Sequence, residues 1–199
     1  MKVKALFFLI VLLLVATVAA GGVAQQMPLP GNWHYVLSNW DFVGGVQSDG
    51  RTPVDWDSSQ LAGKDGVYCE PIGEPCQFRF FNHDKLAAWI YQVVDTEPIP
   101  AGSTLTFNLG MSAKGLLPRS SFFWVTGWYQ GRPVFRVVKA LPARRVDNKD
   151  YLIDIPLDQP VDHLNVVIKM GLSQPKSKLF IHYAAMIATD PPESGLQRR

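Results

Sequence analysis

The sequence predicts an all-β protein, an antiparallel two-sheet β-sandwich preceded by an N-terminal signal helix. Three observations lead to this fold class. Several runs alternate apolar and polar residues with the period of two that is typical of half-buried strands. The 16 glycines and 15 prolines are spread along the chain, as expected for many turns between short strands. The first 24 residues differ from the rest, with a basic start and a long apolar run.

The alternation is clearest in residues 104–110, where Leu105, Phe107 and Leu109 would face the core and the polar residues between them the solvent. Residues 130–133 read Gln-Gly-Arg-Pro and predict a hairpin turn between two such runs. The remaining predicted strands cover residues 77–81, 122–129, 134–138, 150–157, 163–170 and 179–187.

Residues 84–92 are compatible with two structures. Asp84 could cap a helix with Leu86 and Ile90 on its apolar stripe. The same segment could form a strand with Ile90 and Gln92 facing inward. The order of the surrounding elements favours a strand from Trp89 onward.

The N-terminus has the layout of a secretory signal peptide. Lys2 and Lys4 precede an apolar run over residues 5–20, and small residues follow, with cleavage expected after Ala20 or Ala24. An uncleaved anchor is the alternative, although a membrane-spanning helix needs roughly 20 apolar residues. The expected organisation is a signal peptide over 1–24, a lead-in over 25–31, a sandwich domain over 32–190 and a disordered tail over 191–199. The protein is therefore expected to be secreted, periplasmic or on the cell surface.

Charge argues against a nucleic-acid partner. Removal of Lys2 and Lys4 with the signal leaves 17 basic residues against 17 acidic ones. A protein that binds phosphate backbones would show a basic excess. Arg144 and Arg145 with Lys139 and Lys149 form only a mild basic patch, which we interpret as solvated.

The two cysteines, Cys69 and Cys76, predict one disulfide that closes a short loop. Export places them in an oxidising compartment, and a metal pair lacks further ligands at suitable spacing. Free thiols are the other alternative. We expect no metal site and no cofactor.

Three segments of the chain carry a resemblance to a known family. The first is Asn39-Trp40-Asp41-Phe42 followed by Pro53-Val54-Asp55-Trp56. The second runs from Ile90-Tyr91-Gln92-Val93-Val94 to Ile99-Pro100-Ala101-Gly102, and the third covers residues 157–166. These segments resemble carbohydrate-binding modules of the galactose-binding-domain-like superfamily, and the resemblance implies a jelly-roll topology and sugar binding. The chain departs from the family's calcium site, since Val43 follows Phe42 where many members have an acid.

No grouping of residues predicts catalysis. None of the four histidines lies four residues from another histidine or next to a cysteine. A catalytic nucleophile would need a base and a group that orients that base, and the sequence shows no such grouping. Paired carboxylates occur in glycosidases, but the acids between residues 41 and 74 cluster only loosely, as is common on any surface. We therefore interpret the protein as non-enzymatic.

The candidate ligand-binding residues are aromatic. The apolar face of a pyranose stacks on indole and phenol rings, and strand alternation places Trp124 and Trp128 on one face of their strand. Trp89 and Tyr91 would face outward if Ile90 and Gln92 face the core. The alternative is that all four rings are packed core. The leading hypothesis is a module that binds extracellular polysaccharide or glycan. The second is a structural subunit of the cell envelope that binds a protein through the same aromatic face.

Overall fold

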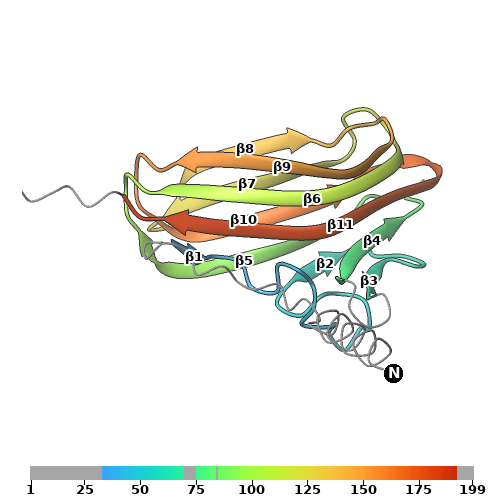
Figure 1. Cartoon of the computed structure of the whole chain (residues 1–199), viewed down its shortest axis with the longest axis horizontal. Helices are drawn as coiled ribbons and strands as arrows, with labels where there is room; N and C mark the ends of the chain where they lie inside the picture. Colours follow the sequence, from blue (N-terminus) through green and yellow to red (C-terminus); the bar gives the residue numbers. More distant parts are fainter. Residues whose placement is uncertain (1–32, 70–74, 84, 192–199) are drawn as a thin grey trace, which may run out of the picture.

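The computed structural model describes residues 33–69, 75–83 and 85–191, and these residues form two antiparallel β-sheets (Figure 1). The predicted fold class, an all-β two-sheet sandwich, is confirmed. The predicted signal segment and most of the predicted tail lie outside the described residues. Within the described part of the chain, no helix is long and apolar enough to cross a membrane.

The first sheet has six strands in the order β3-β4-β11-β6-β9, with β1 pairing with β11 as well. The second has five strands in the order β2-β5-β10-β7-β8. The strands of the first sheet are β1 (Trp33–Tyr35), β3 (Gly66–Tyr68), β4 (Gln77–Phe81), β6 (Thr104–Leu116), β9 (Val146–Pro156) and β11 (Ser173–Thr189). Those of the second are β2 (Asp57–Ser59), β5 (Ala88–Ile99), β7 (Phe122–Tyr129), β8 (Arg132–Ala140) and β10 (Val161–Met170).

The path of the chain through the strands from β4 to β11 is that of a jelly roll. One sheet contains the order β4-β11-β6-β9 and the other β5-β10-β7-β8, so the chain crosses from sheet to sheet between most successive strands. Such double-sheet jelly rolls contain eight strands in two Greek keys. The long strands of both sheets run roughly along the long axis of the molecule (Figure 1).

The inward faces of the two sheets form the core. Leu105, Phe107 and Leu109 are fully buried, as the alternation predicts. Phe107 of β6 contacts Phe123 of β7 across the two layers, with ring centroids 5.1 Å apart. The apolar residues of β10 at alternate positions from Leu164 to Met170 are also fully buried. Burial of these side chains supplies the main stabilising term of the fold.

The ambiguous segment is a strand, since β5 begins at Ala88. Ile90 and Gln92 both face the core. The Gln92 amide is satisfied by the backbone of the preceding loops: it donates to the carbonyl oxygens of Ser38 (3.0 Å) and Asp55 (2.8 Å) and accepts from the Ser38 N–H (3.1 Å). A single buried side chain thereby ties the N-terminal loops to the second sheet.

The hairpin between β7 and β8 is tighter than the predicted turn. Only Gln130 and Gly131 connect the strands, with φ of 50° and 74°. Positive φ at both central residues suits the twist of the flanking strands. Arg132 and Pro133, which the sequence assigns to the turn, belong to β8.

The predicted disulfide between Cys69 and Cys76 is present, with Cα atoms 4.1 Å apart. Cys69 directly follows β3 and Cys76 directly precedes β4. The bond therefore joins the ends of two paired strands at the edge of the first sheet.

Candidate functional site

The outer face of the five-stranded sheet carries all four predicted ligand-binding residues. Trp124 and Trp128 alternate on β7 with the buried Phe123 and Val125, so their rings point away from the core. Trp89 and Tyr91 alternate on β5 with Ala88, Ile90 and Gln92 in the same way. All four rings are half-buried rather than enclosed in the core.

Strand β10 separates these four residues into two pairs. Lys169 of β10 lies directly between Trp89 and Phe122, and its ammonium nitrogen is 5.7 Å and 5.1 Å from the two ring centroids. Two residues earlier on β10, Val167 lies between Tyr91 and Trp124 and is only 3% exposed although it faces outward. Trp89 is thus in contact with the Lys169 ammonium.

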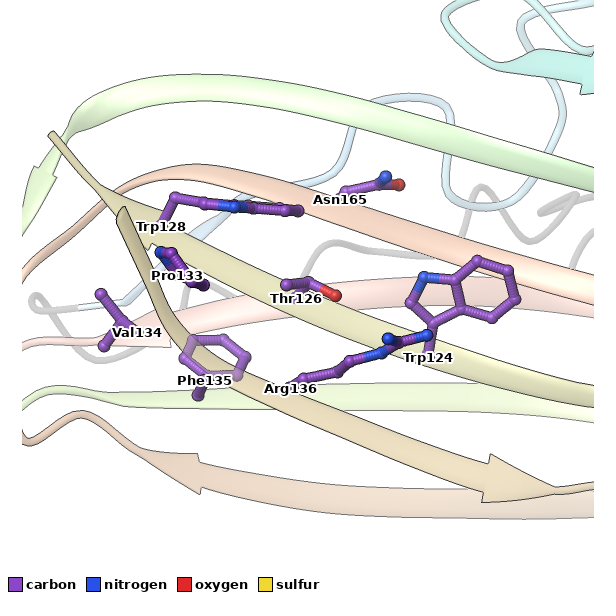
Figure 2. A pocket seen from close by; sticks show the side chains of 8 residues that line it. All are labelled: Trp124, Thr126, Trp128, Pro133, Val134, Phe135, Arg136 and Asn165. Carbon is purple, nitrogen blue, oxygen red and sulfur yellow. The ribbon is translucent and has the colours of Figure 1, made fainter. Parts of the chain in front are cut away.

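A pocket of about 580 Å³ lies over β7 and β8 between Trp124 and Trp128 (Figure 2). The two indoles stand at its ends because they are four residues apart on one strand, and Thr126 lies between them. Its volume falls in the range of roughly 300–1,000 Å³ that is usual for small-molecule sites. The lining residues are Trp124, Thr126, Trp128, Pro133, Val134, Phe135, Arg136 and Asn165.

Besides Thr126, the polar side chains of Arg136 and Asn165 line this pocket. The guanidinium of Arg136 lies beside the Trp124 indole, 5.8 Å from the ring centroid (Figure 2). Asn165 comes from β10, and the indole of Trp128 extends toward it (Figure 2). The Asn165 Oδ1 atom is buried and has no hydrogen-bond partner within the described residues. Buried acceptors are nearly always paired, so this oxygen is an exception on a residue that lines the pocket.

A second pocket of about 600 Å³ shares Trp128 with the first. The His163 ring meets the Trp128 ring edge-on, with centroids 5.0 Å apart, and the His163 Nδ1 is 2.6 Å from the Asp95 Oδ1. Asp162 also lines this pocket and accepts a hydrogen bond from the Gln130 N–H at the hairpin (2.9 Å). Trp128 therefore stands between a pocket with amide and guanidinium groups and a pocket with two carboxylates.

The combination of rings and hydrogen-bonding groups suits a ligand with apolar faces and hydroxyl edges. Asn165, Asp95 and Asp162 can accept hydrogen bonds from hydroxyls, whereas Arg136 can donate to ring or hydroxyl oxygens. Among residues 33–69, 75–83 and 85–191, no group of three or more His, Cys, Asp or Glu side chains could hold a metal ion.

Sequence reasoning did not identify Asn165, Arg136, Asp95 or His163 as candidates. Strand alternation alone puts Asn165 and His163 on the outer face of β10, opposite Leu164 and Val166. Strand alternation does not predict the register between neighbouring strands. That register brings Asn165 opposite Thr126, and His163 opposite both Trp128 and Asp95.

Comparison with known proteins supports the fold. No family model and no curated protein matches the chain. A Fischerella sp. TAU cyclase crystallised with (3Z)-3-(1-methyl-2-pyrrolidinylidene)-3H-indole matches 80% of this chain and all of its own, with 11% identity and a TM-score of 0.52. An arabinose-bound α-L-arabinofuranosidase matches 77% of this chain but only 26% of its own, with 12% identity and a TM-score of 0.55.

A third structure is a carbohydrate-binding module in complex with β-1,4-galactotriose, at 14% identity over 77% of this chain and 97% of its own. Its TM-score of 0.49 is too low to support an argument about this chain. At these identities the comparisons show a shared β-sandwich. They do not place the chain in the galactose-binding-domain-like superfamily that the sequence resembles.

Proposed function

We propose that this chain is an exported, non-catalytic module that binds a polysaccharide or glycan across the outer face of the five-stranded sheet. The binding groups would be Trp124 and Trp128, assisted by Asn165 and Arg136, with Trp89 and Tyr91 extending the surface on the other side of β10. Export rests on the basic and apolar start of the sequence, and the disulfide is compatible with it.

The observation that carries the proposal is the pocket between the two outward-facing indoles, which the polar side chains of Arg136 and Asn165 also line. Leaving a buried acceptor unpaired costs roughly 1–3 kcal/mol. A rotation of the Asn165 amide would pair its oxygen with a ligand hydroxyl while the sugar ring lies against an indole.

The two pockets that share Trp128 favour a chain ligand over a single sugar. Each pocket is large enough for a small ligand, and the Trp128 ring lines both. A glycan of two or three units would place neighbouring units on the two sides of this ring. The carboxylates of Asp95 and Asp162 would then accept hydroxyl hydrogen bonds from the second unit.

The test is a screen of the purified protein against neutral and acidic oligosaccharides of two to six units, followed by calorimetry on the strongest ligand. The Asn165→Leu variant should bind it at least about fivefold more weakly, while its melting temperature stays the same or rises because an unpaired polar group is removed. Asn108→Leu, a change at another half-buried asparagine on the opposite sheet, is the matched control and should leave affinity unchanged.

The envelope-subunit hypothesis makes a different prediction for the same experiment. A protein-binding face would give no glycan ligand in the screen, and Asn165→Leu would make the face more apolar and strengthen protein association. Absence of any bound glycan, or unchanged affinity in Asn165→Leu, would contradict the proposed site.

A further inference from the structure

A second candidate site lies on the first sheet and is rich in positive charge. A pocket of about 470 Å³ is lined by the cationic side chains Lys114, Arg145, Lys176 and Lys178, which we call the lysine pocket. All four are exposed. They come from β6, from the segment before β9 and from β11, so residues far apart in the sequence converge on one place. The other lining residues are Ser112, Ala113, Asp147 and Phe180.

Two of the lysines are direct cross-strand partners. Lys178 of β11 is paired with Lys114 of β6, so both side chains stand on the same face of the sheet. Like charges directly opposite each other in an antiparallel pair destabilise the sheet. The Lys178 ammonium lies 5.7 Å and 5.9 Å from the ring centroids of Phe180 and Phe81. These ring contacts position the ammonium without neutralising its charge.

The third lysine lies in an unfavourable backbone conformation. Lys176 has a φ of 64°, in the left-handed region that glycine and asparagine tolerate best. Its N–H donates to Asn82 Oδ1 (2.8 Å), and the pairing of β11 with β6 is irregular between Ser173 and Lys178. A lysine in this conformation adds a local cost that an asparagine would reduce.

The pocket contains little negative charge to balance these cations. Asp147 is its one acidic lining residue, and its carboxylate is 3.1 Å from the Arg145 Nε. Both partners are about two-thirds exposed, at 68% and 67%, and exposed ion pairs contribute little to stability. Four cations against one carboxylate leave an excess of three positive charges around one cavity.

We propose that the lysine pocket binds a small sulfate or phosphate ester through its oxyanion. A like-charge pair and a left-handed lysine are both locally unfavourable, and unfavourable local features concentrate at functional sites. An oxyanion between the ammonium groups turns their repulsion into charge-assisted hydrogen bonding. Because the exported chain is near neutral overall, a ligand with one local anionic group is favoured over the continuous charge of a nucleic-acid backbone. This inference is independent of the glycan site on the other sheet.

The experiment is a calorimetric titration of the purified protein at low ionic strength with hexose 6-sulfate, hexose 6-phosphate and the unmodified hexose. At least one ester should bind, the unmodified hexose should not, and raising the salt tenfold should weaken binding several-fold because the charges are screened. The preferred ester identifies the oxyanion. Binding of neither ester would overturn the proposal, and so would stronger binding of duplex DNA or of vesicles containing anionic lipid.

Two variants separate binding from folding. Lys176→Asn removes one cation and relieves the backbone, and Lys114→Gln removes the like-charge pair. Each should lower ester affinity at least about threefold while the melting temperature stays the same or rises. Lys64→Gln, at an exposed lysine outside the pocket, is the charge-matched control and should change neither. Unchanged ester affinity in both pocket variants would refute the assignment.

Discussion

Replacement of Trp128 by alanine separates a ligand-contacting ring from a core ring. The Trp128 indole is half-buried and makes one edge-on contact with His163 at 5.0 Å. Removing a fully buried tryptophan costs roughly 3–5 kcal/mol. Because Trp128 is exposed to both pockets, we expect a loss in unfolding free energy of about 1–2 kcal/mol, including the aromatic pair at about 0.5–1.5 kcal/mol. That loss corresponds to a few degrees in melting temperature.

The loss of glycan affinity in Trp128→Ala should exceed what its loss of unfolding free energy alone would cause. If the ring stacks on a sugar, Trp128→Ala should weaken glycan binding by at least about 1 kcal/mol, or roughly fivefold. Trp56→Phe is the control, because Trp56 is 1% exposed, packs on Phe42 at 5.8 Å and donates its indole N–H to the Asn39 carbonyl oxygen at 3.3 Å. It should lower stability by about 1–3 kcal/mol, through a cavity and a lost hydrogen bond, and leave affinity intact.

Chemical denaturation and calorimetry on the same preparations give both quantities. A stability loss of about 3–5 kcal/mol in Trp128→Ala with no change in affinity would refute the reasoning, since the ring would then act as packing. Equal affinity losses in Trp128→Ala and Trp56→Phe would also refute it, because the effect would then be a general consequence of destabilisation.

Three further predictions concern the framework of the fold. Replacing Cys69 and Cys76 by serine should lower the unfolding free energy by about 2–3 kcal/mol, the chain-entropy value for so short a loop, as measured by urea denaturation; an unchanged value would contradict it. Gln92→Leu should cost about 2–4 kcal/mol in the same assay because it removes the three hydrogen bonds that the buried amide makes with the backbone of Ser38 and Asp55, and a neutral effect would show that these backbone groups find other partners. Burial, followed by the hydrogen bond to Asp150, raises the pKa of Tyr183 to about 12 from an ordinary value of 10.0. The neutral phenol is therefore favoured in the folded state, so its stabilising contribution is complete below pH 10 and is lost as the pH rises toward 12. Tyr183→Phe should remove this part of the alkaline pH dependence, and an ultraviolet titration of the wild-type protein that shows no tyrosine with a raised pKa would contradict the assignment.

The fold was largely predictable because it depends on a local pattern. The alternation of Leu105, Phe107 and Leu109 determines which face of β6 is buried, and the same rule correctly places Trp124 and Trp128 on the outside of β7. The Gln130–Gly131 turn follows from residue chemistry, although its length was predicted as four residues rather than two.

The residues that line the two candidate sites are brought together by strand register and by the order of strands in each sheet. A local sequence pattern contains neither. Asn165 reaches the pocket between the indoles because of the register of β10 against β7, which is set by the packing of whole sheets. The sequence grouped Arg145 with Lys139 and Lys149 as a solvated patch. In the structure Arg145 instead lies with Lys114, Lys176 and Lys178, because β6, β9 and β11 are neighbours in the first sheet.

The proposed glycan site lies between Trp124 and Trp128. The most direct measurement follows the indole N–H signals of the six tryptophans by NMR while the strongest oligosaccharide from the screen is added. Tryptophan-to-phenylalanine variants assign each signal. The signals of Trp124 and Trp128 should shift with ligand in a saturable way, while the signal of the buried Trp56 stays in place. Saturable shifts confined to other tryptophans, or none with any oligosaccharide, would contradict the account.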